Sequence, residues 1–255
     1  MNLRAAVAVM IAVTTASLST AAPRVEEDGY DLWLRYRALT KGLKAKYPSS
    51  LGRIVAPGNN PSVGLAVKEL QMGLSGLLGL DAKASKSQLS SGGLVVGTLG
   101  ELGSDLSLNQ NFGGLAREAF VVGPASYKGK AVTVITGRSG VAVLYGAFWL
   151  LRQIQTGSSL PTKLEIHSPK IQHRLLNHWD NLNRSVERGY AGQSIWDWHK
   201  LPDYVDPKIK DYARANASIG INGSVLTNVN SNANLLRPDF IAKAAAIADT
   251  LRPYG

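Results

Sequence analysis

Cysteine is absent from the 255 residues of this chain. Disulfide bonds and thiolate chemistry are therefore excluded. Histidine is also scarce, and its four positions are His167, His173, His178 and His199. No two of these histidines have the spacing of a zinc site, so we expect no structural metal.

The glycine-rich loops that bind nucleotide cofactors are missing as well. Two segments, Gly97–Gly100 and Gly137–Gly140, are rich in glycine, but neither matches the phosphate-loop lysine pattern or the dinucleotide fingerprint. Simple turns between strands and helices explain both segments. We therefore predict that the protein uses no cofactor.

Long hydrophobic runs are lacking, apart from one of nine residues at Ala5–Val13. This run is too short to cross a bilayer, which takes about 20 residues. Arg4 precedes it, and small residues follow up to Ala22. The pattern predicts a signal peptide over residues 1–21 and an exported protein without a membrane partner. The alternative interpretation of the run is a buried helix or a membrane anchor.

Positive charge exceeds negative charge, with 28 Lys and Arg against 18 Asp and Glu and a net charge of +10. Such an excess can indicate nucleic-acid binding. Here the basic side chains are spread along the chain and form no dense block, so we expect no nucleic-acid partner. Acidic polysaccharide fragments fit the charge equally well, and a role in solubility alone remains open.

Hydrophobic periodicity predicts a two-layer α/β domain over residues 22–168. Apolar residues recur with helical spacing after Pro61 and after Ser139, and Ser139 is placed to cap its helix. Short apolar runs between turn residues predict strands at 54–55, 94–97, 119–122 and 131–136. Spaced aromatic residues also predict a helix within Val25–Tyr47. The stretch is long enough to bury its own core.

A different pattern begins at Ile171. A strand at about 173–177 and a helix at 207–218 are followed by a strand at 223–226 and a helix at 237–251. Polar residues follow each strand, as in β/α repeats. A full (β/α)8 barrel needs about 250 residues. The 85 residues of 171–255 therefore suffice for about two β/α units of a truncated barrel.

The segment Ile171–Gly192 carries most of the functional signal. It starts as an apolar strand and then becomes dense in aromatic, amide and charged side chains. Strands of α/β barrels present sugar sites in this way at their carboxyl ends. The sequence therefore predicts a carbohydrate site after the first strand of residues 171–255.

Several longer motifs carry a family resemblance. They are His178–Asn181, Glu187–Gly192, Ile221–Gly223, Thr227–Asn230 and Ala248–Gly255. These motifs resemble the start of the catalytic domain of the family 67 α-glucuronidases. The front domain, with its helix at Val141–Arg152, is similar to the small α/β domain that precedes the barrel in these enzymes and in β-hexosaminidases.

The resemblance implies removal of (4-O-methyl-)glucuronic acid from xylan-derived acidic oligosaccharides, with inversion. One carboxylic acid then protonates the leaving oxygen, and a carboxylate on the opposite face activates water. In the family, both groups lie on later barrel strands, beyond Gly255. We therefore expect no catalytic residue in this chain, and expect the chain alone to be inactive. The oligomeric state is not predicted.

The resemblance also implies binding residues. Trp179 is expected to pack against the sugar, and Val229 to lie near its 4-O-methyl group. Asp180, Asn181, Asn228 and Asn230 are expected to supply hydrogen bonds. The turn at Asn183–Ser185 departs from the family, in which an Asp- and Gly-rich turn is usual.

Structural roles compete with these assignments. Trp179 could belong to the core, and Asp180 could pair with Arg184 or Arg188. Glu187 beside Arg188 favours an ion pair over a catalytic acid. We expect Trp196 and Trp198 to pack in the interior rather than contact a ligand.

Two other functions remain open. A non-catalytic carbohydrate-binding or interaction fragment would use the same tryptophan-rich stretch without turnover. A β-hexosaminidase-like glycosidase would need an adjacent Asp-Glu pair at the end of a barrel strand. The adjacent acidic residues of this chain, Glu26–Asp28, lie near the expected processed N-terminus instead.

Overall fold

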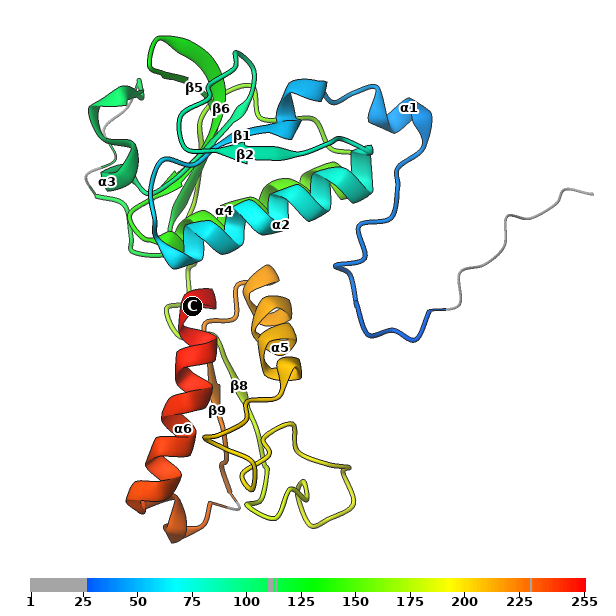
Figure 1. The fold of residues 1–255 in the computed structure, drawn as a ribbon, viewed down its shortest axis with the longest axis vertical. Coiled ribbons are helices and arrows are strands. Elements are labelled where there is room, and N and C mark those ends of the chain that lie inside the picture. The colour runs from blue at the N-terminus through cyan, green and yellow to red at the C-terminus, as the bar shows by residue number, and fades with distance from the viewer. Residues whose placement is uncertain (1–26, 110–111, 113, 230) are drawn as a thin grey trace, which may run out of the picture. The chain divides into compact units, whose positions relative to one another are not determined.

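Two β-sheets of different size organise the chain in the computed structural model (Figure 1). The structure describes residues 27–109, 112, 114–229 and 231–255. The predicted signal peptide, residues 1–21, and the predicted sugar-binding residue Asn230 lie outside the described residues. Residues from Trp33 onward belong to one unit, and the segment before Trp33 is a separate one.

The larger sheet has seven strands in the order β2-β1-β3-β6-β5-β4, with β7 paired to β5. Its strands are β1 Arg53–Val55, β2 Lys83–Ser85, β3 Leu94–Val96, β4 Leu106–Ser107, β5 Phe120–Tyr127, β6 Lys130–Gly137 and β7 Glu165–His167. The pairs β1–β2, β1–β3 and β3–β6 are parallel, whereas β5 is antiparallel to β4, β6 and β7. The predicted strands are therefore all present in this sheet.

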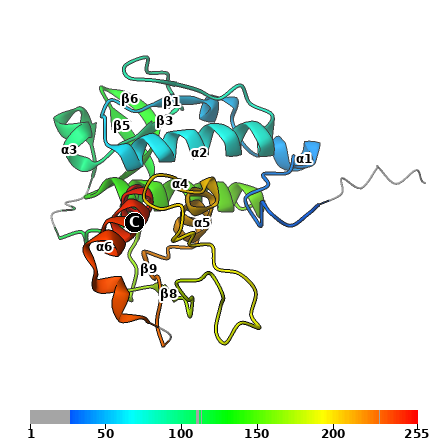
Figure 2. The ribbon, with the colours of Figure 1, turned by 60° about the horizontal axis from the view of Figure 1, so that its bottom comes forward.

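Two long helices, α2 (Pro61–Leu78) and α4 (Gly140–Gln155), run side by side along one face of this sheet (Figures 1 and 2). Each begins at a capping side chain. The Oδ1 atom of Asn60 accepts from the amide of Ser62 at 3.0 Å, and the Oγ atom of Ser139 accepts from the amide of Ala142 at 3.2 Å. Such caps satisfy amides that the helix leaves free, each worth about 1 kcal/mol.

Side-chain alternation along β3 separates two cores. Leu94 and Val96 point into the core that α2 and α4 cover, whereas Val95 points to the opposite face, against Val55 and Val134. The helix residues that the periodicity places on one face are all buried: Val63, Ala66, Val67, Leu70 and Leu74. Burial of one such side chain contributes about 1.5–3 kcal/mol. The two-layer α/β prediction is confirmed.

The aromatic residues whose spacing predicts a helix within Val25–Tyr47 lie outside any helix, so that prediction is wrong for them. The only α-helix among residues 27–47 is α1, Lys41–Lys44. Tyr36 has a φ of 45°, which a right-handed helix cannot contain. Its hydroxyl donates to Oε1 of Glu69 at 2.5 Å, and the side chain is buried. This tertiary contact outweighs the helical spacing of the aromatic residues.

Two β/α units follow, as the sequence predicts. They consist of β8 Leu175–Asn177, α5 Pro207–Ser218, β9 Gly223–Val225 and α6 Pro238–Leu251. The two strands pair in parallel, with Leu175 opposite Gly223 and Asn177 opposite Val225. Short elements complete the described chain: α3 Leu99–Leu102 and 3₁₀ turns at Ser49–Gly52, Gly103–Asp105, Ala233–Leu236 and Arg252–Tyr254.

The β/α units have a small core of their own. Trp196 and Trp198 are fully buried there beside Ile209 and Ile247, which confirms that both tryptophans pack in the interior. In addition, Ala213 and other α5 residues join the core beneath α2 and α4. The predicted domain limits, residues 22–168 and 171–255, stay a prediction. None of the helices within the described residues combines the length and apolar character needed to span a bilayer.

Candidate functional site

The segments after β8 and β9 are joined beyond the ends of the strands. The amide of His178 donates to the carbonyl of Val225 at 3.0 Å, and the amide of Asn228 donates to the carbonyl of His178 at 2.8 Å. The Oγ1 atom of Thr227 then donates to the carbonyl of Asp180 at 2.8 Å. These bonds hold the two segments that are predicted to bind a sugar, one after β8 and one after β9, against each other.

Trp179 and Val229 are exposed in these joined segments. Their exposed fractions are 42% and 66%, so neither side chain belongs to the core. Val229 also has a φ of 48°, in the left-handed region that β-branched residues rarely adopt. Such strain occurs most often at ligand-binding positions.

The predicted polar site residues Asp180, Asn181 and Asn228 differ in their contacts and burial. The side-chain amide of Asn181 donates to the carbonyls of Ser185 and Glu187, at 3.2 and 2.9 Å, and thus shapes its own loop. Asp180 is only 3% exposed. On the other segment, Oδ1 of Asn228 accepts from the amide of Val229 at 2.8 Å. At least part of each polar side chain therefore holds the loops in place.

The turn that departs from the family pattern is built around two left-handed residues, Arg184 with a φ of 72° and Glu187 with a φ of 56°. A glycine would adopt these angles without strain. Nη1 of Arg184 donates to Oδ2 of Asp197 at 3.0 Å. The carboxylate of Asp180 lies instead 3.6 Å from Nδ1 of His178, which does not favour the alternative in which Asp180 pairs with Arg184.

A row of partly buried polar side chains runs beneath the strand ends. From Asp180 it passes to His178, whose Nε2 lies 2.8 Å from the hydroxyl of Tyr212. That hydroxyl lies 2.7 Å from the Oγ atom of Ser224. The ring of Trp196 packs edge-on against both aromatic members. Sequence reasoning missed this row, because Tyr212 and Ser224 carry no motif and meet His178 only in the fold.

Partial burial shifts the pKa values of His178 and Tyr212 in this row of polar side chains. It lowers the pKa of His178 below its usual value, although the neighbouring Asp180 favours the charged ring. Burial also raises the pKa of Tyr212, which the hydrogen bond to Ser224 opposes. Near neutral pH the ring of His178 is therefore neutral and accepts or donates hydrogen bonds without a net charge.

A hollow of about 660 Å³ lies beside the loop after β8. Its polar lining comes from Asn181, Asn183, Glu187, Arg188 and Asn232. The described residues contain no group of three or more His, Cys, Asp or Glu side chains that could bind a metal ion. Of the predicted site residues, Asn181 lines this hollow, and Trp179 and Val229 are exposed outside its lining. An exposed indole, an exposed apolar side chain and amides are groups that recognise a sugar.

Comparison with known proteins decides the family. Residues 32–150 match the profile of the glycosyl hydrolase family 67 N-terminus, and residues 153–255 match that of the family 67 middle domain. The chain belongs to glycoside hydrolase family 67. The family resemblance of the motifs after Asn177 is thereby confirmed.

Curated relatives from fungi share this family. The chain is 34% identical over 236 residues to a probable alpha-glucuronidase A of Aspergillus oryzae, a match that covers 90% of this chain and 27% of that protein. An alpha-glucuronidase of Hypocrea jecorina is 33% identical and is covered to 29% of its length, with 93% of this chain aligned. The chain thus spans less than a third of the length of these relatives.

Solved structures show a weaker likeness. A family GH115 4-O-methyl-alpha-glucuronidase with specificity for decorated arabinogalactans has a TM-score of 0.49 and 18% identity. The match covers 81% of this chain and 28% of that one.

We predict that protonation of His178 destabilises the fold. Since burial lowers its pKa in the folded protein, the unfolded chain binds this proton more readily. The free energy of unfolding should therefore fall as the pH is lowered through the unfolded value of about 6.5. Urea unfolding between pH 7.5 and pH 5 measures this slope.

His178→Gln removes the titrating ring and should flatten the slope between these pH values. The matched control is His199→Gln, which makes the same substitution at an exposed histidine of the same region. An equal slope in wild-type protein and His178→Gln would contradict the assignment.

Proposed function

We propose that this chain forms one wall of the sugar site of an α-glucuronidase. The substrates are xylan-derived acidic oligosaccharides that carry (4-O-methyl-)glucuronic acid, and the reaction is hydrolysis of the α-1,2 link with inversion. The observation that carries the proposal is that the segments bearing the exposed side chains of Trp179 and Val229 are hydrogen-bonded to each other at the carboxyl ends of paired parallel strands. Family membership and the names of the relatives support the activity.

The chemistry of the wall fits a methylated sugar acid. The flat indole of Trp179 packs against a sugar face, and the apolar side chain of Val229 contacts the 4-O-methyl group. Amide atoms of Asn181 and Asn228 that the loops leave unused supply hydrogen bonds to hydroxyls, and Asp180 acts through the row of polar side chains behind them. Asn230 joins this set on its sequence position alone.

The proposal places the general acid and base outside this chain. The mechanism needs two carboxyl groups on opposite faces of the sugar. At the described strand ends, the carboxylate of Asp180 is buried beside His178, and Glu187 lies in a strained turn. Export of the protein belongs to the proposal as well and rests on the sequence of residues 1–21.

Trp179→Ala should weaken the binding of an aldouronic xylo-oligosaccharide roughly tenfold, which corresponds to about 1.4 kcal/mol. The physical reason is the loss of the flat apolar surface under the sugar. Isothermal titration of the 255-residue protein measures the affinity. Trp33→Ala is a matched control, because Trp33 has a similar exposed fraction of 43% but bonds to Ser218 Oγ, away from the strand ends. Equal affinities of the two variants would refute the role of Trp179.

Val229→Asn should separate strain from recognition. Asparagine tolerates a left-handed φ, so the free energy of unfolding should rise by about 1 kcal/mol. The same change removes the apolar contact and should abolish any preference for 4-O-methylated over unmethylated ligand. Thermal unfolding and paired titrations test both effects. Val229→Ala, which keeps the backbone strain, should lose the preference without gaining stability; a retained preference in both variants would exclude the contact.

The 255-residue protein should bind these oligosaccharides without releasing glucuronic acid. Chromatography of released uronic acid after long incubation measures this. Release that disappears when a residue of this chain is replaced would show that the catalytic groups are here. Absence of binding as well as of release would leave neither the sugar wall nor a carbohydrate-binding module tenable.

A further inference from the structure

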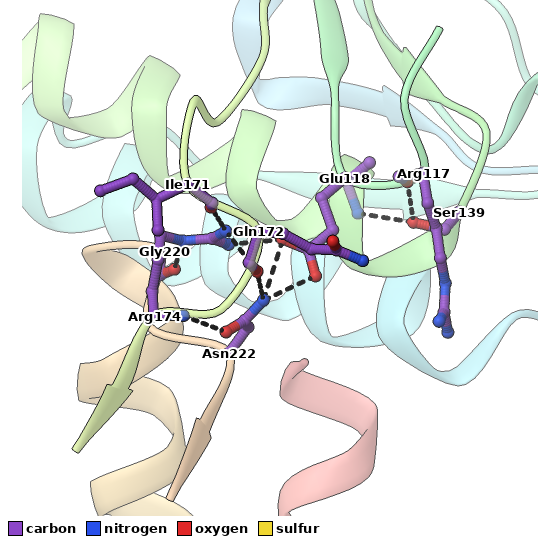
Figure 3. Close-up of polar contacts among 9 residues, drawn as sticks. Arg117, Glu118, Ser139, Ile171, Gln172, Arg174, Gly220 and Asn222 are labelled. Carbon is purple, nitrogen blue, oxygen red and sulfur yellow. Dashed lines mark hydrogen bonds and ion pairs between the residues drawn. The ribbon is translucent and has the colours of Figure 1, made fainter. Parts of the chain in front are cut away.

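One carboxylate contacts the residues that precede both strands of the smaller sheet. Glu118 lies two residues before β5, which is a strand of the larger sheet. Its Oε2 atom pairs with Nη2 of Arg174, the residue before β8 (Figure 3). Its Oε1 atom accepts from Nδ2 of Asn222, the residue before β9, at 3.0 Å. The contact links elements that lie far apart in the sequence.

The two strand-leading residues also bind each other. The amide of Arg174 donates to Oδ1 of Asn222 at 2.9 Å, and the amide of Asn222 donates to the carbonyl of Arg174 at 3.0 Å. The Nδ2 atom of Asn222 reaches the carbonyl of Gln172 at 2.7 Å. The guanidinium of Arg174 donates to the carbonyls of Ile171 and Gly220. We call Glu118, Arg174 and Asn222 the strand-start cluster.

This cluster lies where the fold needs it. The strands β8 and β9 have three residues each, and an isolated two-stranded sheet is marginal in water. Their register is specified by few pairs, and a slip by one residue would turn every side chain to the opposite face. The side chains of Arg174 and Glu118 are 16% and 25% exposed, so water screens their ion pair only partly.

A second ion pair connects the same parts of the chain in a different way. Glu69 of α2 accepts from Nε and Nη2 of Arg214 at 2.8 and 2.7 Å. Arg214 belongs to α5, so this pair anchors a helix and not a strand. It offers a control of the same charge type, with a buried carboxylate and a bidentate arginine.

We propose that Glu118 is a positioning residue for the sugar wall. Acting through Arg174 and Asn222, it sets the register of β8 against β9 at the amino ends of the strands. That register determines how the segments with Trp179 and Val229 meet at the carboxyl ends. The larger sheet therefore serves as the reference frame for the site, a role beyond the proposed function.

Hydrogen exchange of the 255-residue protein tests this proposal without a ligand. Glu118→Ala should speed exchange of the amides of His178 and Asn228 at least tenfold, because these amides join the far ends of the strands. Amides of β5 and β6 should keep their protection. Glu118→Gln should have a smaller effect, since its amide oxygen still accepts from Asn222 but no longer pairs with the charge of Arg174.

The control variant Glu69→Gln should speed exchange in α5, at Ala213 and Ala217, and leave His178 and Asn228 protected. If Glu118→Ala does not fold, Asn222→Ala removes the link to β9 alone and should expose the same two amides. Unchanged exchange at His178 and Asn228 would overturn the proposal. So would an equal rise in both sheets, which indicates general destabilisation.

The effect of Glu118→Ala on the affinity for acidic xylo-oligosaccharides can be interpreted only if the proposed sugar site exists, so that measurement rests on the proposed function. The exchange measurement does not depend on that site, so the two proposals can fail separately.

Discussion

The parallel pairing of β8 with β9 is the constraint on which the candidate site depends. Three residues in each strand supply little pairing energy, and the bonds at both ends of the ladder complete it. At the amino ends the strand-start cluster ties the strands to the larger sheet, and at the carboxyl ends backbone bonds from His178 and Asn228 bring the two loops together. The two strands are thus held together by contacts at both of their ends.

The core explains how so small a sheet can be held in place. Residues of α5 pack into the same apolar cluster as α2 and α4, while Trp196 and Trp198 pack with Ile209 of α5 and Ile247 of α6. A two-stranded sheet gains its stability from such packing rather than from its own hydrogen bonds. The α/β domain therefore supports the two-stranded sheet, and the ion pairs of Glu69 and Glu118 connect it to α5 and to the start of β8.

Periodicity was sufficient to predict most helices and strands, because α2, α4 and α5 each bury one face and begin at a capping residue. The helix α6 begins at a proline and buries Ile247. Periodicity failed where a single distant contact decides the conformation. Tyr36 leaves helical angles, and its hydroxyl donates to Glu69, which lies 33 residues further along the chain. The contacts of His178 with Tyr212 and of Tyr212 with Ser224 could not be predicted either, since these residues lie after β8, in α5 and in β9.

Residues with strained backbone angles gather in the loops after β8 and β9. Val229, Arg184 and Glu187 adopt left-handed angles that cost about 1–2 kcal/mol each for residues other than glycine. All three lie in the loops after β8 and β9, and the larger sheet and its helices carry most of the burial that offsets this cost. A loop shaped only by stability would place glycine or asparagine at these positions. A branched apolar side chain at Val229, exposed to water at a left-handed φ, is therefore the feature of these loops that neither burial nor backbone preference explains.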